Sequence, residues 1–392
     1  LQSDGAGTSG LAAIGLGTQT VNVSGAVYRF AAPSAHTPEP VNLGNVRVGA
    51  VATQALTISN NAVADGFSES LNASLGGATA GITATGSVNQ LAAGGSNSSS
   101  LVVGLDTSSA GAKAGTASIT LQSDGTGTSG LGITGLGTQT VNVSGNVFRL
   151  AQASAHTPEP VNLGNRHVGD VATQALTISN TAINDGFSER LNASLGGATA
   201  GITASGSVSQ LAAGGSNSTN LVVGLDTATA GAKAGTATIT LQSDGAGTSG
   251  LAAIGIGTQT VNVSGAVYRF AAANTLAPVN FGVVHVGDVV QQSLSISNTA
   301  VADGFSESLN ASFGATSDAR ITTSGSVGLL AAGASSNAMS IGLNTAAAGA
   351  VNGSVTVNFA SDGSGTSGLG ITALPSQLVG VSGDIQMTGS VF

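Results

Sequence analysis

Short runs in which hydrophobic and polar residues alternate recur along the whole chain. Residues 41–48 read VNLGNVRV and residues 55–60 read ALTISN, each with apolar side chains two positions apart. This period places the apolar side chains on one face of a β-strand. The same pattern predicts strands at 101–105, 117–121 and 140–147, and weaker ones at 67–75 and 82–91. No segment has a helical period, so the pattern predicts an all-β fold with about seven or more strands in each sandwich.

Turn-forming residues separate these runs. Residues 92–100 read AAGGSNSSS and residues 123–130 read SDGTGTSG, both typical of turns. The Ala-rich stretch SSAGAKAGTA at 108–117 contains glycine every few residues. Each glycine inside a helix costs about 1 kcal/mol relative to alanine, so this stretch is not expected to be helical.

The chain is built from repeats of about 120 residues. The string LQSDG begins at Leu1, Leu121 and Leu241, and a diverged copy, FASDG, begins at Phe359. Residues 33–152 and 153–272 match at 96 of 120 positions, whereas residues 273–392 form a more diverged third copy. Residues 1–32 match only the closing quarter of a repeat. A period of this length is the size of one β-sandwich domain. We therefore predict tandem immunoglobulin-like β-sandwich domains at 33–152, 153–272 and 273–392, preceded by the C-terminal part of an incomplete upstream repeat.

Composition restricts the classes of function. Charged residues make up 7% of the chain and the formal net charge is −9, with no basic cluster. This argues against nucleic-acid binding, which needs several phosphate-neutralising cations. No apolar run approaches the roughly 18–20 residues of a membrane span, so no membrane insertion is expected. The chain has no cysteine and begins at Leu1 in the middle of a repeat. We interpret it as a mature or partial piece of a longer precursor.

No set of catalytic residues recurs in the repeats. The four histidines are His36, His156, His167 and His285, and we interpret them as exposed strand or linker residues. The positions of His36 and His156 have no histidine in the third copy, so a repeated Ser-His-Asp triad is excluded. The sequence therefore predicts a protein that is not an enzyme and has no cofactor.

Recurring acidic residues leave one metal hypothesis open. The carboxylates nearest to a calcium pattern are those of Asp65, Glu69, Asp185 and Glu189. Calcium takes six to eight oxygen ligands, usually from several carboxylates, and here the carboxylates come singly. The alternative is turn chemistry, because an Asp-Gly pair caps a turn and supplies positive φ.

The order of the strings resembles the bacterial choice-of-anchor D repeat domain, an immunoglobulin-like domain related to the ASPM/SPD-2/Hydin group. The resemblance rests on PVNLGNVRVG (Pro40–Gly49) and its counterparts at Pro160–Gly169 and Pro278–Gly287. Each is followed by an L-T/S-I-S-N strand, then DGFSE, LNAS and the LQSDG segment. The resemblance implies an extracellular or cell-surface bacterial protein.

From these features we predict a structural repeat protein that forms a surface filament, sheath or matrix. Its partners would be copies of itself or neighbouring surface proteins. The orphan strand Gly17–Phe30 suggests strand exchange between subunits, with a joint formed by Val21, Val23, Val27, Tyr28 and Phe30. Two alternatives remain: the upstream domain is simply missing from this chain, or the repeats form a non-polymerising adhesin stalk. The three prolines of Ala31–Pro40 predict an extended, semi-stiff linker.

Overall fold

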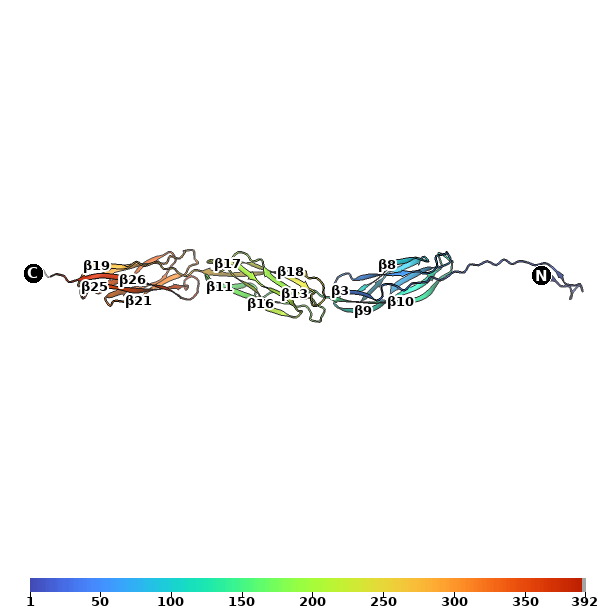
Figure 1. Ribbon diagram of the computed structural model, residues 1–392, viewed down its shortest axis with the longest axis horizontal. Helices are drawn as coiled ribbons and strands as arrows, with labels where there is room; N and C mark the ends of the chain where they lie inside the picture. Colours follow the sequence, from blue (N-terminus) through green and yellow to red (C-terminus); the bar gives the residue numbers. More distant parts are fainter. Residues whose placement is uncertain (390–392) are drawn as a thin grey trace. The chain divides into compact units, whose positions relative to one another are not determined.

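The computed structural model describes residues 1–389, and this part of the chain is all-β (Figure 1). It folds as two compact units, Leu1–Arg149 with one sandwich and Leu150–Phe392 with two. Each sandwich packs a five-stranded sheet against a three-stranded sheet, which confirms the predicted immunoglobulin-like architecture. Within residues 1–389 there is no helix of the length and hydropathy needed to cross a membrane.

The three sandwiches share one topology. In repeat 1 the large sheet has the order β3 (Val41–Arg47), β10 (Ile133–Phe148), β9 (Gly111–Asp124), β5 (Ser70–Gly76) and β7 (Ser87–Leu91). Its small sheet has the order β4 (Thr53–Ser59), β8 (Ser96–Leu105) and β6 (Ile82–Thr85).

Repeats 2 and 3 follow the same order. In repeat 2 the strands are β11 (Val161–His167), β18 (Ile254–Tyr268), β17 (Gly231–Asp244), β13 (Arg190–Gly196) and β15 (Ser207–Leu211), with β12 (Thr173–Ser179), β16 (Ser216–Leu225) and β14 (Ile202–Ser205). In repeat 3 they are β19 (Val279–His285), β26 (Thr372–Gln386), β25 (Gly349–Asp362), β21 (Ser308–Thr316) and β23 (Val327–Leu330), with β20 (Val290–Ser297), β24 (Ser335–Leu343) and β22 (Ile321–Ser324).

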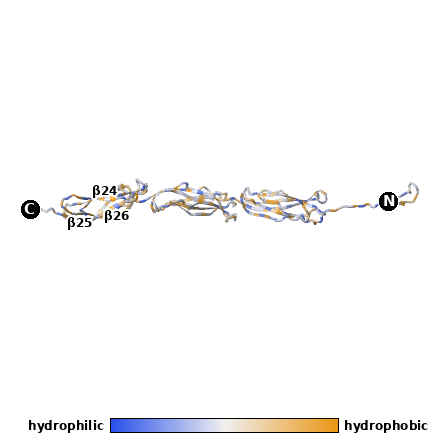
Figure 2. Ribbon diagram, turned by 90° about the horizontal axis from the view of Figure 1, so that it is seen from above, coloured by the Kyte–Doolittle hydropathy of each residue, from blue (hydrophilic) through white to orange (hydrophobic). Residues whose placement is uncertain are grey.

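The alternating residues predicted to face inward form the core. In repeat 1, Leu56 and Ile58 of β4 are fully buried, and Leu101 of β8 and Ile119 of β9 lie in the same cluster. Hydrophobic and hydrophilic residues alternate along the strands in Figure 2. Each core forms because one apolar face of each sheet is removed from water, at about 25 cal/mol for each Å² buried.

Two predicted segments differ from the strands observed. The expected strand at 82–91 is divided, because β6 joins the small sheet and β7 the large one. The chain changes sheets at Gly86, where φ is +113° and a Cβ would lie 1.8 Å from the carbonyl oxygen of Ser100. Part of the Gly/Ala-rich stretch, predicted correctly as non-helical, is the first half of β9.

The Pro-containing linker is not a free connection. Ala31 is buried in the core of repeat 1. Pro33 and Thr37 form antiparallel bridges with Asn60 and Thr57, at the edge of the small sheet. The prediction of an extended linker was therefore wrong, because backbone hydrogen bonds make this segment part of the sandwich.

The last strand of each repeat, here called the closing strand, lies inside the large sheet, next to one of its edge strands. In repeat 1 this is β10, which pairs parallel to β3 and antiparallel to β9. Its Val141, Val143 and Val147 are at most 2% exposed. Gly145 is packed so tightly that a Cβ would lie 2.6 Å from Cδ1 of Leu105 and 2.9 Å from the carbonyl oxygen of Gly44 in β3. A repeat without its closing strand would lose both ladders and part of its core.

We predict that Gly145→Ala destabilises repeat 1 by about 1–3 kcal/mol, because the added methyl group overpacks the contact of β10 with β3. Its unfolding transition in scanning calorimetry should move to lower temperature. The control is Gly132→Ala, whose Cβ meets nothing within 4 Å. Repeat 2 has Ala252 at that position. Equal shifts for the two variants would contradict the close packing at Gly145.

Candidate functional site: the joint at the start of each repeat

The orphan segment, residues 1–32, has the sequence of the closing part of a repeat. Within it, β1 (Gln2–Ser3) and β2 (Ile14–Gly15) pair with each other in a small antiparallel ladder. Residues 16–28 belong to no strand. The predicted joint residues Val21, Val23 and Val27 are 81%, 90% and 89% exposed. Their counterparts in β10 are the buried valines at 141, 143 and 147.

The end of the orphan segment is docked on repeat 1. The Arg29 N–H donates to the Phe67 carbonyl over 2.8 Å, and the Glu69 N–H donates to the Arg29 carbonyl over 2.9 Å. The Arg29 guanidinium lies 2.7 Å from the carboxylate of Asp65. The Tyr28 ring packs against Phe67 with centroids 5.6 Å apart. Tyr28 therefore contacts repeat 1 of its own chain, and Phe30 remains 57% exposed. The joint between subunits stays a prediction.

The same contacts occur where β18 of repeat 2 leads into repeat 3. The Arg269 N–H donates to the Phe305 carbonyl over 2.8 Å, and the Arg269 guanidinium lies 2.7 Å from Asp303. Tyr268 packs on Phe305 with centroids 5.5 Å apart. The last residues of one closing strand thus make the first contacts of the next repeat.

A buried carboxylate lies beneath each of these contacts. Glu69 is 2% exposed, and its two oxygens accept hydrogen bonds from the hydroxyls of Ser123 and Ser129, both over 2.7 Å. The Ser123 hydroxyl in turn accepts the N–H of Ala31. Repeats 2 and 3 have the same arrangement at Glu189 with Ser243 and Ser249, and at Glu307 with Ser361 and Ser367. Hydrogen bonds of this kind offset the large cost of burying a charge.

A buried asparagine connects the joint to the rest of the sandwich. Asn60 is fully buried, and its amide nitrogen donates to the carbonyls of Glu69 and Leu91. Its side-chain oxygen accepts the N–H of Ala32. Asn180 and Asn298 make the equivalent bonds. The asparagine that ends each L-T/S-I-S-N strand therefore holds the incoming chain against the DGFSE loop.

His167 completes the joint between repeats 2 and 3. Its Nε2 lies 2.8 Å from Oε1 of Glu307, and its ring stacks on Phe270 with centroids 4.1 Å apart. The Asn165 amide also donates to the Ser367 carbonyl over 2.6 Å. The interpretation of His167 as an exposed residue was wrong, because its side chain is 12% exposed. His285, at the same position of repeat 3, is 54% exposed.

The other two histidines are also buried. The Nδ1 atom of His36 lies 2.8 Å from Gln139 and its Nε2 lies 2.9 Å from Glu39. His36 and His156 are each 6% exposed, so both were wrongly placed on the surface. In all three repeats the backbone N–H at this position donates to the closing-strand glutamine, from His36 to Gln139, from His156 to Gln259 and from Leu276 to Gln377. The histidine side chains of repeats 1 and 2 add hydrogen bonds to that glutamine and to a nearby glutamate.

The carboxylates considered as calcium ligands already accept hydrogen bonds from protein groups. The carboxylate of Asp65 accepts from Arg29 and from the Phe67 N–H, and Asp185 accepts from the Phe187 N–H. Glu69 and Glu189 accept from their serine pairs. Among residues 1–389, no three His, Cys, Asp or Glu side chains come close enough to hold a metal ion.

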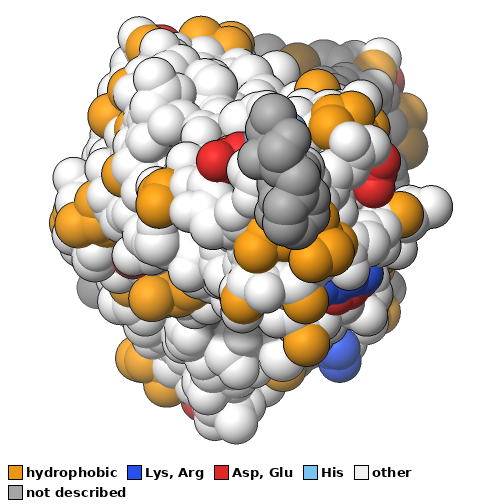
Figure 3. All heavy atoms as spheres, turned by 90° about the vertical axis from the view of Figure 1, so that its left-hand side faces the viewer, with side chains coloured by type: hydrophobic (Ala, Val, Ile, Leu, Met, Phe, Trp, Pro, Cys, Tyr) orange, Lys and Arg blue, Asp and Glu red, His pale blue; other side chains and the backbone are white. Residues whose placement is uncertain are grey.

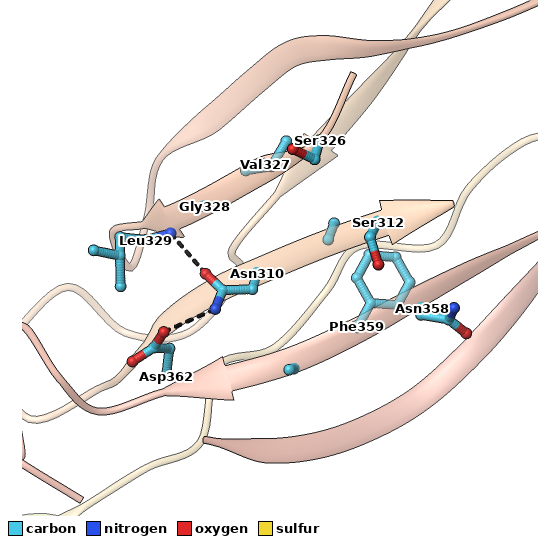
Figure 4. A pocket seen from close by; sticks show the side chains of 11 residues that line it. Asn310, Ser312, Ser326, Val327, Gly328, Leu329, Asn358, Phe359 and Asp362 are labelled. Atoms are coloured by element: carbon cyan, nitrogen blue, oxygen red, sulfur yellow. Dashed lines mark hydrogen bonds between the residues drawn. The ribbon is translucent and has the colours of Figure 1, made fainter. Parts of the chain in front are cut away.

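A hollow on the large sheet of repeat 3 is lined by residues that already satisfy one another (Figure 4). The Asn310 side chain accepts the Leu329 N–H over 2.7 Å and donates to Asp362 over 2.8 Å. Leu329 has a φ of +50°, and the asparagine holds this turn in place. Asn72 and Asn192 make the same pair of bonds in repeats 1 and 2. We therefore assign this hollow a structural role.

Sequence reasoning missed the serines of the joint. Ser123, Ser129 and their counterparts were interpreted as turn residues. The available signal was their recurrence: every complete repeat pairs a DGFSE glutamate with serines 54 and 60 positions later. Recurrence alone does not reveal that these positions meet.

Known proteins similar to this chain are found among solved structures. No family model and no curated protein matches the chain. Similar solved structures include the human desmocollin-1 ectodomain, with 9% identity and a TM-score of 0.33 over 91% of this chain. Drosophila N-cadherin EC1-4 has 10% identity and a TM-score of 0.29, covering 89% of this chain and 74% of its own.

Extracellular domains 3–5 of Drosophila OTK match 94% of this chain and 100% of their own, with 9% identity and a TM-score of 0.23. The present chain spans 62% of the desmocollin structure. The sheet topology of the three described repeats makes the protein a tandem array of immunoglobulin-like sandwiches.

We predict that His167 and Glu307 are energetically coupled. In a double-mutant cycle of His167→Ala and Glu307→Gln, the coupling free energy should be about 0.5–3 kcal/mol, as for residues in direct contact. Calorimetric unfolding of the full chain measures it. The control cycle combines His285→Ala with Glu307→Gln and should be additive. Additivity in both cycles would show that the contact between His167 and Glu307 contributes no coupling energy.

The ion pair at the same joint predicts a dependence on pH. The Arg269 guanidinium, followed by the Phe305 N–H, lowers the pKa of Asp303 below its ordinary value of 3.8. A lowered pKa stabilises the folded state above the ordinary value, and this contribution is lost as pH falls through the lowered one. In an NMR titration, Arg269→Gln should raise the pKa of Asp303. The pKa of Asp318, whose partner is Arg320, should be unchanged. An unchanged pKa of Asp303 would contradict its ion pair with Arg269.

Proposed function

We propose that this protein is a non-enzymatic, extracellular structural repeat protein that builds a bacterial surface filament, sheath or matrix. The proposal includes membership of the choice-of-anchor D-like group, on the strings that resemble that family. The observation that carries it is the recurrence of one joint. The contacts at Tyr28 and Arg29 on repeat 1 are the contacts at Tyr268 and Arg269 on repeat 3.

This joint suits a load-bearing array. It combines backbone hydrogen bonds, a ring contact and an ion pair, and it follows the closing strand without an intervening linker. Arg269 and Ala271 are both held by repeat 3, through Phe305 and Ser361. Few charged side chains lie on the face seen in Figure 3, and the whole chain has only nine Lys and Arg residues. Such a surface offers few sites to trypsin-like proteases, which cut after Lys and Arg.

Strand exchange is the proposed mode of assembly. Residues 19–27 carry every side chain that a closing strand uses: Gln19, Val21, Val23, Gly25 and Val27. Burying a valine fully gains roughly 1.5–3 kcal/mol, so three exposed valines favour insertion into a sheet. A neighbouring subunit that accepts this strand would gain a central strand with the sequence its core requires.

One observation favours the alternative, an adhesin stalk that does not polymerise. All three sandwiches of the described chain contain their own closing strands, β10, β18 and β26. No slot is therefore open in repeats 1 to 3, and exchange requires that one of these strands be displaced. A stalk needs only the joints within the chain.

Negative-stain electron microscopy of the native protein, taken from the cell surface or medium, separates the two functions. The proposal predicts uniform fibres with a regular axial repeat. In the double variant Val21→Asp, Val23→Asp the fibres should be lost, because two carboxylates would enter the core of the acceptor. The matched control is Val51→Asp, at a position 88% exposed outside the strand. Isolated particles of the native protein would establish the stalk instead.

A further inference from the structure

A buried histidine in repeat 1 contacts two oxygen atoms at once. His36 is 6% exposed. Its Nδ1 atom lies 2.8 Å from Oε1 of Gln139 in the closing strand, and its Nε2 atom lies 2.9 Å from Oε2 of Glu39. A neutral imidazole has one N–H donor and one nitrogen lone pair, whereas an imidazolium has two donors. The protonation state of this ring therefore depends on whether both oxygens are acceptors.

The orientation of the Gln139 amide is fixed by its other contacts. Its Nε2 atom donates to the carbonyl oxygen of Ser34 over 2.7 Å, which leaves Oε1 on the side of the histidine. The same Oε1 atom accepts the backbone N–H of His36 over 3.0 Å. Because an amide oxygen accepts hydrogen bonds and donates none, the Nδ1 atom of His36 carries a proton.

The Glu39 carboxylate makes the same demand of the other ring nitrogen. Besides contacting His36, it accepts the backbone N–H and the side-chain amide of Asn142 in the closing strand. Burial raises the pKa of Glu39, but the hydrogen bonds from His36 and Asn142 outweigh burial and hold this pKa below its ordinary value. An ionised carboxylate is an acceptor only, so the Nε2 atom of His36 also carries a proton and the ring is an imidazolium.

Repeat 2 contains the same arrangement, and repeat 3 does not. His156 is also 6% exposed, and it contacts Gln259 through Nδ1 over 2.9 Å and Glu159 through Nε2 over 2.8 Å. In repeat 3 the histidine position is Leu276, and residues 271–278 read AAANTLAP, without a glutamate. The chain thus provides its own comparison, a sandwich of the same topology without the ionisable pair.

One carboxylate faces the buried ring of repeat 1. Among the described residues, the ionisable group paired with His36 is Glu39, which precedes β3. The contact from β10 is the uncharged amide of Gln139. The small sheet approaches this segment at Thr57, also uncharged, which forms a bridge with Thr37. Protonation of the ring is therefore opposed by burial and favoured by one negative charge and one amide oxygen.

We propose that this histidine–glutamate pair, here called the latch, binds one proton in folded repeats 1 and 2 and fastens the first segment of each repeat to its closing strand. In the unfolded chain a histidine is mostly neutral above its ordinary pKa of about 6.5. Folding of repeats 1 and 2 therefore takes up a proton above that value, and their stability decreases as pH rises. The latch acts within one sandwich, so it operates equally in a fibre and in a stalk.

The latch has a defined pH range. When the ring loses a proton, one of its nitrogens presents a lone pair to an oxygen atom, and a hydrogen bond is lost. At the acidic end, the lowered pKa of Glu39 means that its carboxylate stabilises the fold above the ordinary value of 4.5, and this contribution is lost as pH falls through the lowered value. Repeats 1 and 2 are therefore most stable at weakly acidic to neutral pH, whereas repeat 3 has no latch to lose.

Imidazole nitrogen chemical shifts test the protonation state in the unmodified, full-length protein. Each of the four histidines is labelled with nitrogen-15 and is assigned by the loss of its signals in a single-residue variant. At about one pH unit above the ordinary histidine pKa, both nitrogens of His36 and His156 should have imidazolium shifts. The reference is His285, 54% exposed, which should be mostly neutral. An unprotonated ring nitrogen at His36 or His156 would overturn the proposal.

Glu39→Gln removes the charge of the latch in repeat 1 and keeps the size of the side chain. The His36 ring should then be neutral at the same pH. The His156 ring, whose partner Glu159 is intact, should remain an imidazolium and serves as the control in the same molecule. Unchanged imidazolium shifts for His36 would contradict the latch, because they would show that Glu39 does not hold the proton.

The pH dependence of unfolding tests the consequence for stability. His36 is the only histidine of residues 33–152. Above neutral pH the folding equilibrium constant of repeat 1 should fall by up to about tenfold for each pH unit, as expected for the uptake of one proton. Urea unfolding of the full chain, followed through NMR signals of repeat 1, measures it.

His36→Leu introduces the residue that repeat 3 has at this position and should remove the pH dependence of repeat 1. Equal pH dependence in the native chain and in this variant would overturn the proposal. If the variant does not fold, the ring shifts of the unmodified protein still decide between a protonated and a neutral latch.

Discussion

The structure depends on where its closing strand lies. A strand at the edge of a sheet can be lost at the cost of one ladder, but β10 and its counterparts lie between two neighbours. Each pairs with a partner from the start of its repeat and with another from shortly before its own end. The first and last parts of each repeat are thereby joined in one sheet, and the sandwich closes only when its final strand is present.

The closing strand of repeat 2 also couples that repeat to repeat 3, and the end of the orphan segment makes the same contacts with repeat 1. Its last residues leave the sheet and immediately bond the DGFSE loop that follows, at Arg29 and again at Arg269. The same stretch of chain therefore contributes to the core of one repeat and to the joint with the next. At repeat 1, Arg29 forms a bridge with Ser68 and Ala31 is buried in the core.

Charged residues are few, and one glutamate in each repeat is buried at the joint. In a chain with 7% charged residues, glutamate is fully buried at positions 189 and 307 and nearly so at 69. Each carboxylate is bonded by two serine hydroxyls from the LQSDG segment and the turn after it, and Glu307 also by His167. Removing one member leaves the others buried and unpaired, which costs more than the bond itself contributes. Such a network favours one geometry at the joint over slightly shifted ones.

The sequence by itself determined the period, the all-β class and most core positions. Leu56, Ile58 and Val141 were predictable because strand periodicity is local and burial follows from it. Only the tertiary structure decided the joint: Glu69 meets Ser123 and Ser129 because β5 and β9 are neighbours, which no spacing along the chain reveals. The tertiary structure also decided that two histidines are covered, since His36 and His167 contact residues about a hundred or more positions away. Periodicity shows which face of a strand is apolar, whereas the partners of its polar residues depend on which strands become neighbours.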